Sequence, residues 1–121
     1  VNQKGNASGQ VLREGRYEVL QRLRVPWAAY GEFSGMHLCT NPDNRAIDAS
    51  SFDPFETPWQ ELKRNSSDAV TKLRLAMLIN GVEFNGFPGG TISSAHSQSD
   101  LEFTIDAFEE SLHMLQAEQQ I

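Results

Sequence analysis

Apolar residues recur at helical spacing in three stretches of this chain, and polar or charged residues fill the positions between them. In the first stretch, about residues 9–24, four apolar positions can share one stripe: Leu12, Val19, Leu20 and Leu23. This pattern predicts an amphipathic helix, although Gly15 in its middle costs roughly 1 kcal/mol relative to alanine. Pro26 ends the helix because the residue before a proline is pushed away from helical angles. Residues 1–8 are small and polar, and we expect a frayed end there.

Two further helices are predicted in the second half of the chain. One begins at Ser67, covers about residues 68–80, and has a buried side made of Val70, Leu73, Ala76 and Met77. Gly81 is placed to end it in the left-handed conformation. The last helix has the most regular pattern, with apolar residues spaced 4, 3, 4 and 3 apart: Leu101, Ile105, Phe108, Leu112 and Leu115. Ser97 is its expected N-cap, with Asp100 as the partner in a capping box.

The segments between the helices predict short strands. Residues 27–41 are rich in aromatic and small side chains and predict one long strand or two short ones. Strict alternation along this segment places Tyr30, Met36 and Leu38 on one face, and Trp27, Phe33, His37 and Cys39 on the other. Apolar groups on both faces predict an inner strand. Residues 82–84 and 91–94 predict two more strands on either side of a glycine-rich turn at residues 85–90.

The order helix, strand, helix, strand, strand, helix predicts an α/β (α+β) fold. We expect a two-layer sandwich in which a small, mainly antiparallel sheet carries helices on one face. With 121 residues, the chain has the size of a single domain, residues 1–121. Residues 42–58 predict a loop that packs on this domain through Ile47, Phe52 and Phe55.

The composition indicates which partners and which cellular compartment to expect. The net charge is -6 and no run of Lys or Arg occurs, which argues against nucleic acid as a partner. No apolar run approaches the ~20 residues that span a bilayer, so we expect no membrane partner. The N-terminal residues lack the apolar stretch of a signal peptide. The single cysteine, Cys39, suits a reducing compartment. A cytoplasmic protein is therefore expected.

The residues that could carry chemistry do not form a known catalytic pattern. Ser34 in GEFSG lacks the flanking glycines of a nucleophile elbow. His37 and Cys39 alternate onto one strand face and could be two metal ligands, but zinc needs three or four, so packing is the favoured interpretation. His96 is either a site residue near a helix N-terminus or a ring that packs in the turn, and the second is favoured. We therefore predict no catalytic residue and no metal.

Two segments together resemble the C-terminal small domain of class III aminotransferases, which depend on pyridoxal phosphate. Residues 30–40, YGEFSGMHLCT, resemble the family's strand near the start of that domain. Residues 73–115 are similar to its closing pattern: a helix ending in L-x-x-G-V, a short strand, a turn, S-x-A-H-(T/S), and a final helix. The resemblance covers residues 29–117 and is strongest to the glutamate-1-semialdehyde aminomutase-like branch.

This resemblance implies a chain that lacks the cofactor-binding part. In the family, pyridoxal phosphate is held by a Schiff-base lysine in a large domain. None of the three lysines, Lys4, Lys63 and Lys72, stands in that sequence context. No arginine follows Arg74 to bind a substrate carboxylate, and the turn at residues 86–89 lacks the glutamate of the aminomutase-like branch. The resemblance implies that a substrate cleft in a complete enzyme would be edged by Ser34, Phe87, Gly89 and Gly90. An equally favoured interpretation is that these residues have only a structural role, as a tight turn filled by one aromatic side chain.

Two functions compete at this point. The first is a truncated or isolated aminotransferase domain that is not catalytic alone, holds no cofactor itself, and has a large pyridoxal-phosphate-binding domain as its partner. The second is a stand-alone module for protein interaction or small-ligand binding. Because the chain has more aromatic residues than a small core hides, we also expect a homodimer.

Overall fold

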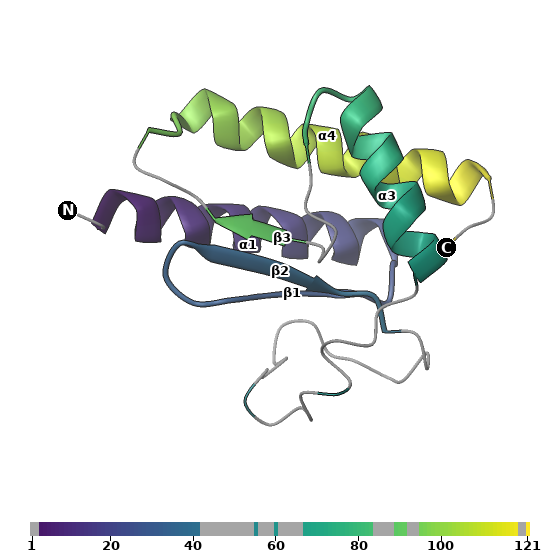
Figure 1. Cartoon of the computed structure of the whole chain (residues 1–121), viewed down its shortest axis with the longest axis horizontal. Coiled ribbons are helices and arrows are strands. Elements are labelled where there is room, and N and C mark those ends of the chain that lie inside the picture. The colour runs from purple at the N-terminus through teal and green to yellow at the C-terminus, as the bar shows by residue number, and fades with distance from the viewer. Residues whose placement is uncertain are drawn as a thin grey trace.

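The computed structural model describes residues 3–41, 55, 60, 67–83, 89–91, 95–118 and 121. Within these residues it contains three helices and a three-stranded sheet (Figure 1). The helices are α1 (Gln3–Leu23), α3 (Ser67–Ile79) and α4 (Gln98–Ala117). The strands are β1 (Ala28–Tyr30), β2 (Gly35–Cys39) and β3 (Gly89–Thr91).

The sheet is antiparallel throughout and has the order β1-β2-β3. Residues 27–41 form two short strands joined by a hairpin, and β2 is the inner strand, as predicted. Helix α1 packs on β1 and β2, α4 packs on α1, and α3 packs on α4. Figure 1 shows all three helices on the same side of the sheet. The predicted α+β class, with a small antiparallel sheet covered on one face, is confirmed.

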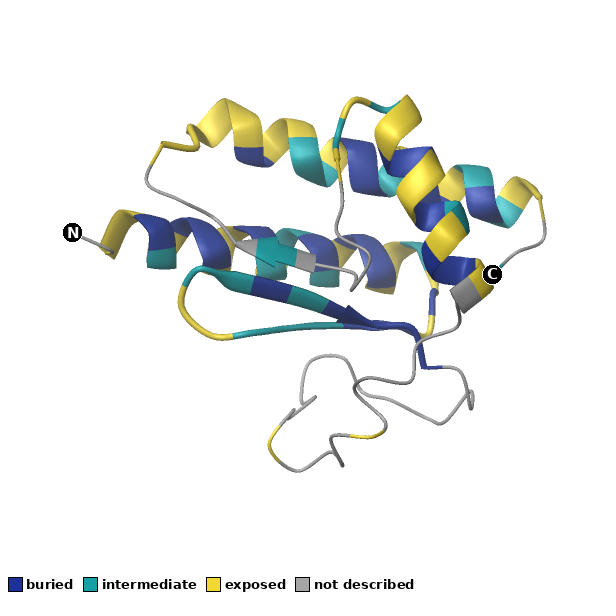
Figure 2. Ribbon diagram, viewed as in Figure 1, coloured by how far each residue is buried: buried dark blue, intermediate teal, exposed yellow. Residues whose placement is uncertain are grey.

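The core lies between the helices and the covered face of the sheet, where Figure 2 shows the buried positions of each helix turned inward. The stripes predicted from periodicity form it: Leu12, Val19 and Leu20 from α1, Leu73, Ala76 and Met77 from α3, and Phe108, Leu112 and Leu115 from α4. Leu23 and Ile105 lie at its margin, partly buried. The sheet contributes Trp27, Met36 and Leu38.

The hairpin changes which strand residues share a face. Residues directly opposite each other on neighbouring strands point to the same face, and Tyr30 pairs with His37. Tyr30 therefore lies with His37 on the face away from the helices, whereas Trp27 lies with Met36 in the core. The predicted faces were wrong for both aromatic residues because strict alternation was carried through the turn, where it does not hold.

Helix α1 begins earlier than predicted. The expected frayed segment, residues 1–8, belongs to the helix from Gln3 onward, and the small residues Gly5, Ser8 and Gly9 are buried. These three positions are spaced like one helical face. Polar and small residues predict a frayed end, but small side chains on one face also allow a helix to approach its neighbour closely.

The predicted ends of α3 and α4 are confirmed. Gly81 has φ +92, and the N–H groups of Gly81 and Val82 donate to Leu78 O (3.0 Å) and Met77 O (2.8 Å). At the start of α4, the Ser97 hydroxyl accepts from the Asp100 N–H (3.1 Å), and the Ser97 N–H donates to the Asp100 carboxylate (2.7 Å). This is the predicted capping box.

The second predicted hairpin differs from the observed structure. Val82 and Glu83 are not in a strand, and β3 begins at Gly89, inside the predicted turn. Phe55, expected to pack on the domain, is 79% exposed. Ile47, Phe52 and Phe87 lie outside the described residues.

Candidate functional site

The turn that joins β1 to β2 has a tightly constrained backbone. We call residues 31–35 the hairpin tip. Gly31 has φ +146, and a Cβ there would lie 2.4 Å from the carbonyl oxygen of Gly35. The Gly35 N–H donates to Glu32 O at 2.8 Å and closes the turn. Only glycine fits position 31, because both the dihedral angle and the space exclude a side chain.

Arg13 of α1 holds the hairpin tip from the helix side. Its Nη1 donates to the carbonyl oxygens of Phe33 (2.8 Å) and Gly35 (2.6 Å), the two residues that flank Ser34. Burial lowers the pKa of Arg13, while Glu14 and Glu32 raise it. The guanidinium remains protonated at neutral pH, so both hydrogen bonds are charge-assisted and stronger than neutral ones.

Helix α1 also approaches the hairpin tip closely at Gly9, which has no side chain. A Cβ on Gly9 would lie 2.3 Å from Phe33 O and 2.9 Å from Ser34 Cα. At this site Phe33 has φ +52, an uncommon conformation for a bulky residue, and its side chain is 68% exposed. Gly9 and Arg13 thus fix a tip that presents Ser34 and the Phe33 ring at the edge of the sheet.

Next to the hairpin tip, the sheet face that points away from the helices carries two aromatic rings in tilted contact. Tyr30 and His37 have ring centroids 5.4 Å apart. Burial raises the pKa of Tyr30, with a further rise from Cys39, and burial lowers the pKa of His37. Both rings are therefore neutral at pH 7 in this half-buried position. Gly89 lies opposite His37 on β3.

The structure brings together three of the four residues predicted to edge a cleft. Ser34 directly precedes Gly35, which pairs with Thr91, and Gly90 pairs with Met36. Ser34, Gly89 and Gly90 therefore lie at one end of the sheet, and a Cβ on Gly90 would meet open space. Phe87 lies outside the described residues. That these residues edge a substrate cleft stays a prediction.

The sequence interpretation missed Arg13, Tyr30 and His37 as parts of this region. The residues next to Arg13 in the sequence do not indicate its role, since its hydrogen bonds reach residues 20 and 22 positions away. Tyr30 could have been placed beside His37 if the glycines at positions 31 and 35 had been taken as a hairpin signal.

The described residues do not fit a covalent pyridoxal phosphate site. Lys4 is exposed at the start of α1 and Lys72 is on α3, so neither belongs to the hairpin tip, and Lys63 lies outside the described residues. No group of three or more His, Cys, Asp and Glu side chains gathers in the part of the chain that the structure describes. His96 is exposed just before the Ser97 cap. None of the helices described is long and apolar enough to cross a membrane.

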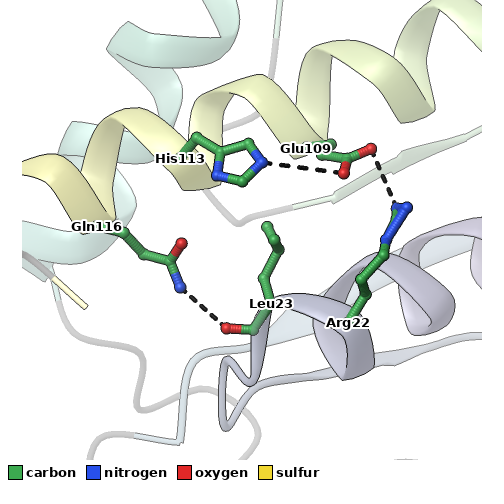
Figure 3. A network of polar contacts seen from close by, with 5 residues as sticks. All are labelled: Arg22, Leu23, Glu109, His113 and Gln116. Carbon is green, nitrogen blue, oxygen red and sulfur yellow. Dashed lines mark hydrogen bonds and ion pairs between the residues drawn. The ribbon is translucent and has the colours of Figure 1, made fainter.

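A second polar cluster joins the C-terminal ends of α1 and α4 (Figure 3). Arg22 forms an ion pair with Glu109 at 3.0 Å, and His113 lies 3.9 Å from the same carboxylate. The Gln116 side chain donates to Leu23 O at 3.0 Å, which satisfies a carbonyl at the end of α1. Arg22 and His113 are half exposed, and such pairs contribute about 0–1 kcal/mol. The cluster caps α1 and positions nothing near the hairpin tip.

One charged side chain, Arg16, is part of the core. It is 1% exposed, its Nη1 lies 3.1 Å from Met36 Sδ, and its guanidinium lies 4.9 Å from the centroid of the Phe108 ring. Burial lowers the pKa of Arg16 to about 9, so it remains charged at neutral pH. It packs between Met36 of the sheet and Phe108 of α4.

Two solved structures show where else this fold occurs. A transaminase with pyridoxal phosphate bound matches 99% of this chain with a TM-score of 0.75 and 19% sequence identity. An omega-transaminase from Sphaerobacter thermophilus matches 89% of the chain with a TM-score of 0.65 and 23% identity. The chain spans 24% and 23% of those proteins, about a quarter of their length. No protein-family model matches the sequence.

Proposed function

We propose that this chain serves as the small domain of a pyridoxal-phosphate-dependent class III aminotransferase, covering the edge of a substrate cleft whose cofactor is held elsewhere. The observation that carries this proposal is the match of 99% of the chain to a quarter of a transaminase at a TM-score of 0.75. The sequence resemblance over residues 29–117 supports it independently of the fold.

In this function the hairpin tip would be the part of the chain nearest the substrate. Pyridoxal phosphate, when bound by the larger part of such an enzyme, supplies the electron sink for the reaction at the substrate amine. The tip would exclude water and shape the cleft wall through Ser34, Gly89 and Gly90, with Phe87 as the fourth wall residue. Arg13 and Gly9 keep the tip in one conformation, so little ordering is needed when the cleft closes.

The same proposal holds that the chain does not transaminate alone. Transamination needs an amine that forms a Schiff base with the cofactor and a site for its phosphate. The described lysines, Lys4 and Lys72, belong to α1 and α3, and neither is among the residues of the hairpin tip. We place the enzyme in the aminomutase-like branch on the strength of the resemblance over residues 29–117, and in the cytoplasm because a single cysteine suits a reducing compartment.

A spectroscopic titration tests this function. Stoichiometric pyridoxal phosphate is added to the purified chain, the Schiff-base absorbance band is recorded, and borohydride is used to trap any adduct for peptide mapping. We expect weak adducts spread over Lys4, Lys63 and Lys72, and no turnover of an amino acid. Trapping at one lysine together with turnover would show that the chain is an enzyme by itself.

A second candidate function is a stand-alone interaction module that reuses the fold. It is favoured by a specific observation: several large apolar side chains of α3 and α4 are more than half exposed. In that function the exposed apolar side chains of α3 and α4 would contact the binding partner. Titration of the chain with pyridoxal phosphate does not bear on this candidate, but the oligomeric state does.

A further inference from the structure

An asparagine followed by a glycine stands where α3 ends. Asn80 comes directly after the helix, and Gly81 has φ +92. Asparagine is chemically labile in proteins, and it loses its side-chain amide fastest before glycine, because glycine has no side chain to hinder attack by its backbone nitrogen. The sequence contains two such pairs, Asn80–Gly81 and Asn85–Gly86, and the first lies within the described residues.

The side chain of Asn80 is held against α4 by hydrogen-bond acceptors. Its Nδ2 donates to Ala76 O at 2.9 Å, to Ser111 Oγ at 3.2 Å and to Met114 Sδ at 3.4 Å. The fully buried Ser111 hydroxyl donates in turn to Ala107 O at 2.6 Å, so it faces Asn80 as an acceptor. Three acceptors around one position favour an amide nitrogen there and disfavour a carboxylate oxygen.

The same contacts oppose deamidation while α3 and α4 are packed together. In this reaction the backbone nitrogen of Gly81 attacks the Cγ of Asn80. The Asn80 amide instead points back to Ala76 O, in the preceding turn of the helix. The Gly81 N–H donates to Leu78 O at 3.0 Å, which stabilises the protonated amide, whereas the nucleophile is the deprotonated one. The pair can therefore react only when the end of α3 leaves these partners.

We propose that Asn80–Gly81 is a site of spontaneous deamidation, and that the contact between α3 and α4 controls its rate. Packing protects the amide, and each local opening exposes it. In the reaction the Gly81 nitrogen bonds to Asn80 Cγ, the Cγ–Nδ2 bond breaks, and ammonia leaves with the proton of the Gly81 amide. Water then opens the succinimide at one of its two carbonyl groups, which gives aspartate or isoaspartate.

The product does not fit the position that the amide occupied. A carboxylate oxygen in place of Nδ2 would face Ala76 O and Met114 Sδ, and Ser111 would have to leave Ala107 O to donate to it. A charge that loses water without gaining donors is unfavourable. Isoaspartate also adds a carbon atom to the main chain directly before Gly81. Deamidation therefore makes the opening permanent, so that the end of α3 stays apart from α4.

A comparison of reaction rates tests the proposal. The folded chain and a synthetic peptide of residues 75–83 are incubated in the same mildly alkaline buffer. Trypsin cleaves after Arg74 and Glu-C protease after Glu83, which separates Asn80 from Asn85, and mass spectrometry measures the conversion of each fragment. We expect Asn80 to react at least about tenfold more slowly in the folded chain, because the reaction waits for local opening. In urea that unfolds the chain, the two rates should be equal.

Variants of α4 test whether the contact with Asn80 provides the protection. Ser111→Ala and Met114→Leu each remove one acceptor and should speed deamidation at least about threefold. Thr104→Ala is the matched control: the Thr104 hydroxyl also donates to the carbonyl four residues earlier, at 2.8 Å, but it is about two turns away from Ser111 along α4. Small additions of urea bring the wild type to the global stability of each variant, so that a faster rate reports on the local contact.

A further pair of variants tests the effect of the product. Asn80→Asp introduces the carboxylate, and Asn80→Ala removes the amide without adding charge. The reporter is the Val82 amide, which donates to Met77 O at 2.8 Å and closes the end of α3. Its hydrogen exchange should be at least about tenfold faster in Asn80→Asp than in Asn80→Ala, because only the first places a charge among acceptors.

Three results would overturn the proposal: equal rates in the folded chain and the peptide, acceptor variants that react no faster than Thr104→Ala, or a Val82 amide equally protected in Asn80→Asp and Asn80→Ala. The first measurement uses the wild-type chain, so it does not depend on whether a variant folds. None of the three involves pyridoxal phosphate, so they are distinct from failure of the proposed enzyme function.

Discussion

Replacing Gly9 with alanine sets two opposite effects of one methyl group against each other. Alanine in the interior of a helix is more favourable than glycine by about 1 kcal/mol, so helix propensity predicts a gain in stability. The structure predicts a loss, because the new Cβ would lie 2.3 Å from Phe33 O and 2.9 Å from Ser34 Cα. Both are backbone atoms, and no side-chain rotation relieves the clash.

The size of the loss follows from the gap that must open. A carbon atom rests about 3.3 Å from a carbonyl oxygen, so α1 and the hairpin tip must separate by roughly 1 Å at this point. Overpacking of this kind costs about 1–3 kcal/mol. The two Arg13 hydrogen bonds, at 2.6 and 2.8 Å, cross the same gap, and charged hydrogen bonds are worth about 1.5–3 kcal/mol each. After the propensity gain, we expect a net loss of about 1–3 kcal/mol.

Gly15→Ala is the matched control in the same helix. Its Cβ would lie 2.4 Å from Ile105 Cδ1, the end of a half-buried side chain that can rotate or shift. We expect Gly15→Ala to remain within about 1 kcal/mol of the wild type, because propensity offsets a smaller repacking cost. Shortening the neighbour with Ile105→Val should remove the shortest contact, 2.4 Å to Cδ1, and leave the 2.9 Å contact to Cγ1 as the smaller repacking cost.

Urea unfolding followed by far-ultraviolet circular dichroism gives the free energies for all three variants. Hydrogen exchange at the Gly35 amide, which donates to Glu32 O, reports on the hairpin tip itself and should become faster in Gly9→Ala alone. The reasoning is refuted if Gly9→Ala is as stable as the wild type, or if it loses no more than Gly15→Ala.

Three further variants test other parts of the structure. Arg13→Met should speed exchange at the Gly35 amide at least tenfold relative to global unfolding, and equal protection would show that Arg13 does not hold the hairpin tip. Arg16→Met should be neutral or stabilising by up to about 2 kcal/mol at pH 7, since apolar replacement of a buried charge is often favourable. The difference in stability between Arg16→Met and the wild type should shrink above pH 9. The reason is that the lowered pKa of about 9 lets Arg16 lose its proton in the folded wild type before it does so in the unfolded chain. A clear loss of stability of Arg16→Met in thermal melts at pH 7 would contradict this expectation. Asp100→Asn should be less stable than the wild type at pH 7 and equal to it near pH 2. The Ser97 hydrogen bonds lower the pKa of Asp100 below 3.8. The stability that the Asp100 carboxylate contributes is therefore present above that pH and is lost as the pH falls through the lowered pKa.

Local patterns predicted the helices well because their determinants are close in sequence. The capping box joins residues three positions apart, and the regular apolar spacing of α4 placed Leu101, Phe108 and Leu112 in the core. Gly81 ends α3 as its position indicated. Each of these features depends on contacts within one or two helical turns.

The candidate site was less predictable because it depends on distant segments. Gly15 was interpreted as a cost to the helix, yet it allows Ile105, ninety positions later, to pack against α1. Gly9 likewise was placed at the start of a helix, with no indication that the hairpin tip would lie against it. The sequence predicted that Ser34, Gly89 and Gly90 belong together only through the family resemblance, since no spacing rule joins them.

The contact between Gly9 and Ser34 has a consequence for any exchange of segments between this chain and a relative. The loop between the first two strands is closed by its own Gly35–Glu32 hydrogen bond, but it is also held by contacts with the helix twenty-odd residues before it. Transplanting the loop without the helix would remove the support that fixes its conformation. A chimera should therefore carry both pieces or neither, with the boundary placed before Gly9 or after the second strand.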